Sequence, residues 1–200
     1  MTLTHVTVTV RQTAASPVLT VPNAITLLRV LLIPLIAYCI VSGAYGAAFA
    51  GLMAAGASDL LDGFIARRLK QFSRIGAMLD PLADKLTILT AVVLLAWHEL
   101  IPVWLAAAIV VRDAVIVSGA VAYHFVVGRV EIAPTPLSKV NTFLEFGVVA
   151  AVLASAAEIV DAGSALPVLF LVLLLTVAGS GLQYVWVWGW KAARKTQRAA

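Results

Sequence analysis

The chain has 200 residues, of which 62% are hydrophobic and 12% are charged, and its formal net charge is +4. Soluble domains average roughly half apolar and a quarter charged residues, so this composition excludes an ordinary soluble domain and predicts a membrane protein. The basic residues stand beside apolar runs, which argues against a nucleic-acid partner. Cys39 is the single cysteine, so neither a disulfide framework nor a thiolate metal site is available.

The predicted organisation is all-α: a polytopic membrane bundle of six transmembrane helices between two tails. Residues 1–20 are rich in Thr and Val, and we expect an N-terminal tail there and no signal peptide. Residues 21–190 are expected to form the membrane domain, and 191–200 a basic C-terminal tail. Charge-free runs and the breakers between them predict spans at 24–42, 46–67, 76–97, 102–124, 140–157 and 166–188.

The charge-free run from 30 to 58 is too long for one upright span and too short for two complete ones. A hairpin at Gly43–Gly46 resolves this conflict only if both helices include polar ends. Arg29, Asp59 and Asp62 then lie near membrane depth, where a charged side chain needs a cavity or a partner.

The distribution of Lys and Arg predicts the orientation in the membrane. The loops at 43–45, 98–101 and 158–165 contain no Lys or Arg, whereas the opposite side carries 13 of the 14 basic residues, all except Arg112. The positive-inside rule therefore places both termini in the cytoplasm. Tryptophans near both ends of the spans fit aromatic belts at the two interfaces, although core packing would also explain any one of them.

Four aspartates flank the loop between the second and third predicted spans. Asp59 and Asp62 are three residues apart and Asp80 and Asp84 are four apart, so each pair lines one face of a helix. Four like charges at membrane depth need compensation, and hard divalent cations prefer oxygen ligands. Two metal ions about 4 Å apart would satisfy this set. A salt-bridged network with nearby basic residues is the alternative.

The aspartates belong to a longer pattern, Asp-x2-Asp-Gly-x2-Ala-Arg-x8-Gly-x3-Asp-x3-Asp, which occupies residues 59–84. This pattern resembles the signature of the CDP-alcohol phosphatidyltransferase family, and every specified position is filled. The resemblance implies a six-helix membrane bundle, often a homodimer, with an active site that faces the cytoplasm. It also implies two Mg²⁺ or Mn²⁺ ions as cofactors.

The resemblance assigns roles to residues of this chain position by position. Asp59, Asp62, Asp80 and Asp84 would be the metal ligands, and Asp84 would also be the general base that accepts the proton of the alcohol. The residues that would hold the CDP portion of the donor lipid are Asn23, Thr26, Gly63, Ala66, Arg67, Ser73 and Gly76. Arg29 belongs to the same polar opening of the first helix, or is an ordinary basic anchor at the interface.

Arg112, Lys139 and Asn141 are the candidates for binding the phosphate of the acceptor. A cation that faces inward in an apolar span suits a phosphate ligand. The alternative is an internal ion pair, either between Arg112 and Glu145 or between Lys139 and Asp113.

The segments outside the signature are most similar to those of CMP-forming cardiolipin synthases, notably Leu100-Ile-Pro-Val103 and Pro136-Leu-Ser-Lys-Val-Asn-Thr142. This resemblance implies CDP-diacylglycerol and phosphatidylglycerol as substrates. It favours a bacterial cytoplasmic membrane, with the mitochondrial inner membrane as the alternative. A phosphatidylglycerophosphate synthase, which would use glycerol 3-phosphate, and a divalent-metal transporter stay open as other functions.

Overall fold

The computed structural model describes the backbone of residues 21–69, 76–127 and 136–199. Side chains are described for residues 27–58, 82–119, 136–184 and Trp186. Within these ranges the chain is α-helical and contains no β-strand. The helices are α1 (Val21–Val41), α2 (Tyr45–Leu69), α3 (Gly76–Trp97), α4 (Val103–Val127), α5 (Pro136–Ala156) and α6 (Leu166–Ala199).

Each described helix corresponds to one predicted span, and most boundaries agree within a few residues. The differences are at the ends of the last two helices. Helix α5 begins at Pro136 instead of residue 140, because proline is well suited to the first turn of a helix. Helix α6 continues to Ala199, past the predicted end at 188. The basic segment after Trp190 is rich in Ala, Lys, Arg and Gln, which have high helix propensity.

The turns after α1, α3 and α5 share one backbone conformation. Gly43, Glu99 and Glu158 have φ values of 75°, 61° and 57°, in the left-handed region. In each turn the following amide donates back to a carbonyl five residues earlier, for example Ala44 N to Cys39 O at 2.8 Å. These are helix C-caps, and the predicted hairpin near Gly43 is confirmed.

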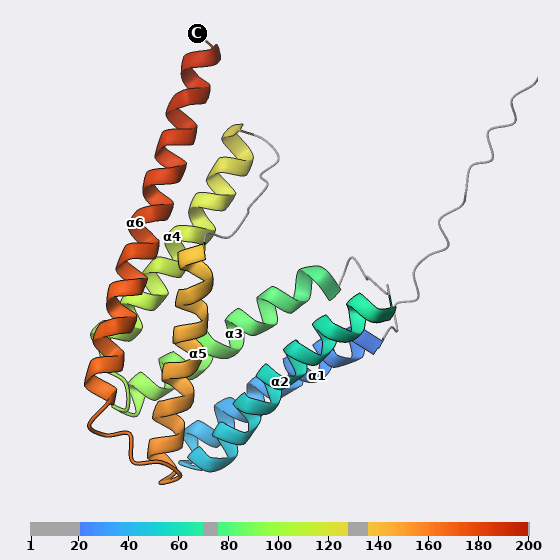
Figure 1. The fold of residues 1–200 in the computed structure, drawn as a ribbon, viewed down its shortest axis with the longest axis vertical. Helices are drawn as coiled ribbons and strands as arrows, with labels where there is room; N and C mark the ends of the chain where they lie inside the picture. Colours follow the sequence, from blue (N-terminus) through green and yellow to red (C-terminus); the bar gives the residue numbers. More distant parts are fainter. Residues whose placement is uncertain (1–20, 70–75, 128–135, 200) are drawn as a thin grey trace, which may run out of the picture.

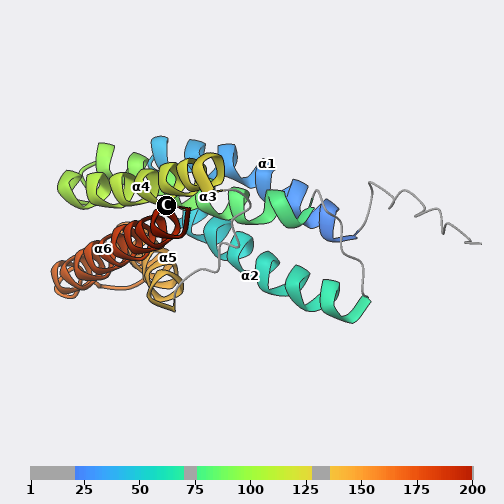
Figure 2. The same ribbon diagram turned by 90° about the horizontal axis from the view of Figure 1, so that it is seen from above.

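The helices run up and down and form two groups that cross at an angle (Figures 1 and 2). Helix α1 packs against α2 and α3, while α6 packs against α4 and α5. Contacts of α5 with α2 and of α3 with α4 and α5 join the groups. The C-terminal ends of α1, α3 and α5 gather at the lower end of Figure 1, and α6 ends on the opposite side.

A core of aliphatic side chains joins the two groups. Each helix contributes at least one fully buried member, for example Ile40 of α1, Leu52 of α2, Leu95 of α3, Leu105 of α4 and Leu153 of α5. Cys39 is part of this cluster, in agreement with a packing role. The core therefore holds α2, α3 and α5 in fixed positions relative to one another.

The outer surface is also rich in apolar side chains. Large hydrophobic residues are exposed along several helices, including Trp97, Val103 and Leu182. In the part of the chain described with side chains, two segments are long and apolar enough to cross a membrane, namely Pro136–Ala156 and Leu166–Tyr184. Leu27–Val41 is a shorter apolar stretch.

Candidate active site

The four aspartates lie on two helices that both pack against α1. Asp59 and Asp62 are in the last three turns of α2, and Asp80 and Asp84 are in the first three turns of α3. The chain direction of the two helices is opposite (Figure 1), so both pairs lie toward the same end of the α1–α3 group. Only Asp84 among them has a described side chain, and the geometry of the complete carboxylate set is therefore outside the described residues.

Asp84 forms an ion pair with Arg29 of α1. Arg29 Nη1 donates to Asp84 Oδ1 at 2.7 Å, and the side chain of Arg29 is 1% exposed while that of Asp84 is 41% exposed. A buried guanidinium that reaches a carboxylate on another helix is not an interfacial anchor, so that reading of Arg29 is wrong. The contact fixes the orientation of Asp84 and leaves its side chain partly accessible.

Asp84 lines a cavity of about 510 Å³ between α1, α2, α3 and α5. This volume falls within the range of roughly 300–1,000 Å³ that is common for small-ligand sites. Lys139 lines the same cavity from α5, although 55 residues separate it from Asp84. Within the described part of the chain, no carboxylate pairs with the ammonium group of Lys139. The other lining residues are Arg29, Leu52, Ala55, Gly56, Lys85, Thr87, Ile88, Ser138, Thr142, Phe143, Glu145 and Phe146.

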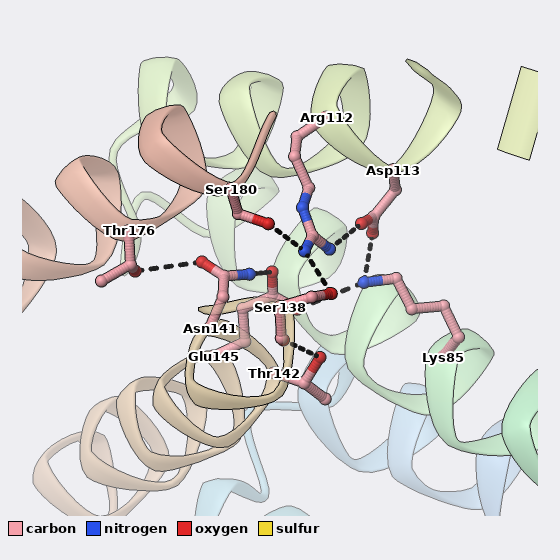
Figure 3. Close-up of polar contacts among 9 residues, drawn as sticks. All are labelled: Lys85, Arg112, Asp113, Ser138, Asn141, Thr142, Glu145, Thr176 and Ser180. Atoms are coloured by element: carbon pink, nitrogen blue, oxygen red, sulfur yellow. Dashed lines mark hydrogen bonds and ion pairs between the residues drawn. The ribbon is translucent and has the colours of Figure 1, made fainter. Parts of the chain in front are cut away.

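A polar network adjoins this cavity and shares the lining residues Lys85, Ser138 and Glu145 with it. Figure 3 shows the contacts of the network. Its charged members are two cations and two anions. Lys85 Nζ lies 2.6 Å from Asp113 Oδ2 and 3.3 Å from Glu145 Oε2, and Arg112 Nη1 donates to Asp113 Oδ1 at 2.9 Å. Glu145 is fully buried. Opposite charges therefore balance within the network, as burial of charge requires.

Hydroxyl and amide groups connect the network to α5 and α6. Arg112 Nη2 donates to Ser138 Oγ at 2.9 Å and to Ser180 Oγ at 2.6 Å. Asn141 Nδ2 donates to Glu145 Oε1 at 2.6 Å, and the hydroxyl of Thr176 donates to Asn141 Oδ1 at 3.0 Å. The network thus joins α3, α4, α5 and α6.

The three residues predicted to bind the acceptor phosphate have different positions. Lys139 lines the cavity, whereas Arg112 and Asn141 are buried in the network and are not among the lining residues. The alternative of an internal ion pair is confirmed for Arg112, but the partners named for both pairs are wrong. Asp113 pairs with Lys85 and Arg112 instead of Lys139, and Glu145 pairs with Lys85 instead of Arg112.

The predicted donor-binding residues lie on the α1–α3 group. Asn23 and Thr26 are in the first two turns of α1, Gly63, Ala66 and Arg67 are in α2, and Gly76 begins α3. Their side-chain environments, like Ser73 itself, lie outside the described residues. Among the described side chains, no three His, Cys, Asp or Glu residues are grouped as a metal site.

Lys85 and Ser138 line the cavity but were not predicted as site residues from the sequence. One signal was present for Lys85: it directly follows Asp84 inside a predicted span, where a charge needs a partner. Ser138 had no such signal, because a serine near the start of a helix is common and often forms a hydrogen bond with the nearby backbone.

The sequence of the chain matches a known protein family. The family model described as CDP-alcohol phosphatidyltransferase matches residues 19–187. A probable CMP-forming cardiolipin synthase of Drosophila melanogaster is 33% identical over 184 residues, which cover 84% of this chain and 57% of the relative.

Two further relatives carry related names. The human cardiolipin synthase (CMP-forming) is 36% identical over 152 residues, covering 68% of this chain and 50% of the relative. That of Streptomyces coelicolor is 39% identical over 105 residues, covering 50% of this chain and 49% of the relative. The chain spans about half the length of these curated relatives. The match along most of its length shows that the chain belongs to the CDP-alcohol phosphatidyltransferase family.

Proposed function

We propose that this chain transfers the phosphatidyl group of CDP-diacylglycerol to a hydroxyl of phosphatidylglycerol, forming cardiolipin and CMP. The observation that carries the proposal is the cavity in which Asp84, a signature carboxylate, and Lys139, a cation without an ion-pair partner among the described residues, face the same space. Family membership and the names of the relatives support the same activity.

The signature aspartates are proposed to hold Mg²⁺ or Mn²⁺, with two ions in the site. Carboxylate oxygens are the ligands these ions prefer, and Asp84 meets the requirement for access because its side chain is partly exposed on the cavity wall. Asp59, Asp62 and Asp80 would complete the set. When bound, the metal supplies positive charge that stabilises the leaving CMP.

Asp84 is proposed to accept the proton of the acceptor hydroxyl. The alcohol oxygen then forms a bond to the phosphorus that carries diacylglycerol, while the bond from that phosphorus to the CMP oxygen breaks. The proton passes from Asp84 to solvent after each turnover. Arg29 keeps one oxygen of Asp84 in a fixed direction, which favours a defined approach of the hydroxyl.

Donor and acceptor are proposed to use different walls of the site. Asn23, Thr26, Gly63, Ala66, Arg67, Ser73 and Gly76 would hold the CDP portion on the α1–α3 side. Lys139 would contact the phosphodiester of the acceptor from α5. Arg112 and Asn141 would act by holding Ser138 and Glu145 in place, since their polar groups bond within the network.

We further propose that all six helices cross the membrane, with both termini and the active site on the cytoplasmic side. The apolar outer surface and the loops without Lys or Arg support this arrangement. A bacterial cytoplasmic membrane fits the proposal best, with the mitochondrial inner membrane as the alternative location. A homodimer is the proposed assembly.

An acceptor panel tests the function. Purified protein is incubated with CDP-diacylglycerol, metal and one of four acceptors: phosphatidylglycerol, glycerol 3-phosphate, inositol or serine. The proposal expects release of CMP with phosphatidylglycerol and a product with the mass of cardiolipin. Phosphatidylglycerophosphate as the main product would assign the chain to another branch of the family.

A further inference from the structure

Among the described side chains, two carboxylates line the cavity, and they differ in exposure. The side chain of Asp84 is 41% exposed, whereas that of Glu145 is 0% exposed. Glu145 has no part in the proposed reaction. A carboxylate that is removed from water needs a partner of opposite charge, because an unpaired buried charge is costly. Glu145 therefore requires a cation close by.

Lys85 supplies this cation from α3. Its Nζ lies 3.3 Å from Oε2 of Glu145, and Asn141 donates to Oε1 of the same carboxylate at 2.6 Å. Among the described side chains, no other cation lies within ion-pair distance of Glu145. The second partner of Lys85 is Asp113, which also pairs with Arg112 and does not line the cavity. Loss of Lys85 would thus leave Glu145, but not Asp113, without a cation.

Lys139 lines the same cavity as Glu145 and belongs to the same helix. Six positions separate residues 139 and 145, which corresponds to roughly 9 Å along the axis of α5. At the effective dielectric constant of a protein, an uncompensated charge at this distance changes the binding of a charged ligand about tenfold. An unpaired Glu145 would attract the ammonium group of Lys139 and repel an anion bound beside it.

We infer that Lys85 is a positioning residue of this site, which neutralises Glu145 and so keeps Lys139 available to the phosphate of the acceptor. In this role Lys85 contacts no substrate itself. The inference rests on the proposed function, since it takes Lys139 as the residue that binds the acceptor. It accounts for the different surroundings of the two lysines on the cavity wall. Lys85 pairs with two carboxylates, and Lys139 pairs with none of those described.

The test compares two variants for which the inference predicts opposite results. Lys85→Met removes the cation and leaves Glu145 charged and unpaired. Lys85→Met/Glu145→Gln removes both charges, and the glutamine retains a side-chain oxygen that can accept from Asn141. Asp113→Asn is the matched control, because it removes the other carboxylate partner of Lys85 and leaves the pair with Glu145 in place. The values of kcat and KM for both lipids are measured in mixed micelles.

Lys85→Met should raise the KM for phosphatidylglycerol about tenfold, whereas the KM for CDP-diacylglycerol should change by less than about twofold. The double variant should return to within about twofold of the wild-type KM, because no unpaired charge is left beside the cavity. Asp113→Asn should lower thermal stability in detergent, since Arg112 loses its ion pair, without raising the KM for phosphatidylglycerol.

Acetylation of Lys139 by a water-soluble N-hydroxysuccinimide ester, followed by mass spectrometry, gives a second readout that needs no turnover. Lys139 is exposed, so the reagent can reach it in the wild-type protein. A nearby unpaired carboxylate favours the ammonium form, which does not react with the ester. Acetylation of Lys139 should therefore be about tenfold slower in Lys85→Met, by the same electrostatic effect. In the double variant it should be as fast as in wild type.

A double variant that stays impaired toward phosphatidylglycerol would overturn the inference, because Lys85 would then contact the substrate directly. An equally high KM in Asp113→Asn would also overturn it, since the defect would come from the network as a whole. If Lys85→Met does not fold, the charge-balanced double variant must still show the wild-type KM, and a raised value refutes the inference. Absence of cardiolipin with wild-type protein would instead refute the proposed function, and acetylation of Lys139 would still show whether Lys85 controls this lysine.

Discussion

Asp84 and Arg29 form the contact nearest to the proposed chemistry, and each makes a separate prediction. Replacing Asp84 with Asn removes the proton acceptor but keeps the size and most polar contacts of the side chain. We expect turnover to fall by about 10²–10⁴-fold, the usual contribution of a general base. Binding of CDP-diacylglycerol, measured by calorimetry, should persist. Normal turnover with weakened donor binding would contradict the proposed role.

Arg29→Met removes the charged hydrogen bond to Asp84 while retaining an unbranched apolar side chain in a buried position. Loss of such a bond costs about 1.5–3 kcal/mol, so kcat/KM should fall roughly ten- to 150-fold. The fall should appear mainly in kcat, because the proposed contacts of both substrates are with other residues. Arg29→Lys, which keeps the charge, is the control and should recover part of the activity.

Only part of this contact was predictable from the sequence. Arg29 and Asp84 both stood out as charges inside apolar spans, and the need for partners followed directly. Their pairing did not follow, because they are 55 residues apart and join only when α1 packs against α3. For the same reason the partners assigned to Asp113 and Glu145 were wrong.

Helix α5 connects the cavity with the rest of the bundle. Its Ser138, Asn141 and Glu145 bond to α4, α6 and α3 respectively, while Lys139 on the same turns faces the cavity. The helix itself was predictable from its apolar run, but its start at Pro136 was not, since a proline signals a turn as readily as a first helical turn. Which of its polar residues face inward was set by packing.

Arg112 bonds to the polar network, whereas Lys139 faces the cavity, so substitutions of the two residues should have different effects. Arg112→Met breaks hydrogen bonds to three side chains on three helices, so the free energy of unfolding should fall by about 3 kcal/mol. Lys139→Ala breaks no described ion pair and should leave thermal stability in detergent nearly unchanged. It should instead raise the KM for phosphatidylglycerol, by about tenfold or more. A stable Arg112→Met variant with the same acceptor defect would make Arg112 a direct ligand.

At the scale of the whole molecule, the alternation of helix ends predicts which segments lie on the same side of the membrane. The single Cys39 is buried, so Cys39→Ala gives a background for labelling with an impermeant maleimide. Ser42→Cys and Ala162→Cys should react in intact cells, and Gln197→Cys only after permeabilisation. The reverse pattern would contradict the proposed orientation.

The number and positions of the described helices were predictable from the sequence because charge-free runs and their breakers are local features. The arrangement into two crossing groups was not, since it depends on which helix faces share small and aliphatic residues. The aspartates were recognisable because their spacing matches the signature of the family to which the chain belongs. The cavity was not, because its walls come from α1, α2, α3 and α5.

The site beside Asp84 is proposed to transfer a phosphatidyl group with the help of divalent metal. The direct measurement follows CMP and cardiolipin in the same reaction of purified protein with CDP-diacylglycerol and phosphatidylglycerol, while Mg²⁺ or Mn²⁺ is titrated into chelator-treated enzyme. We predict that both products appear in equal amounts and only when metal is added. Full activity in excess chelator, or CMP release without cardiolipin, would contradict the account.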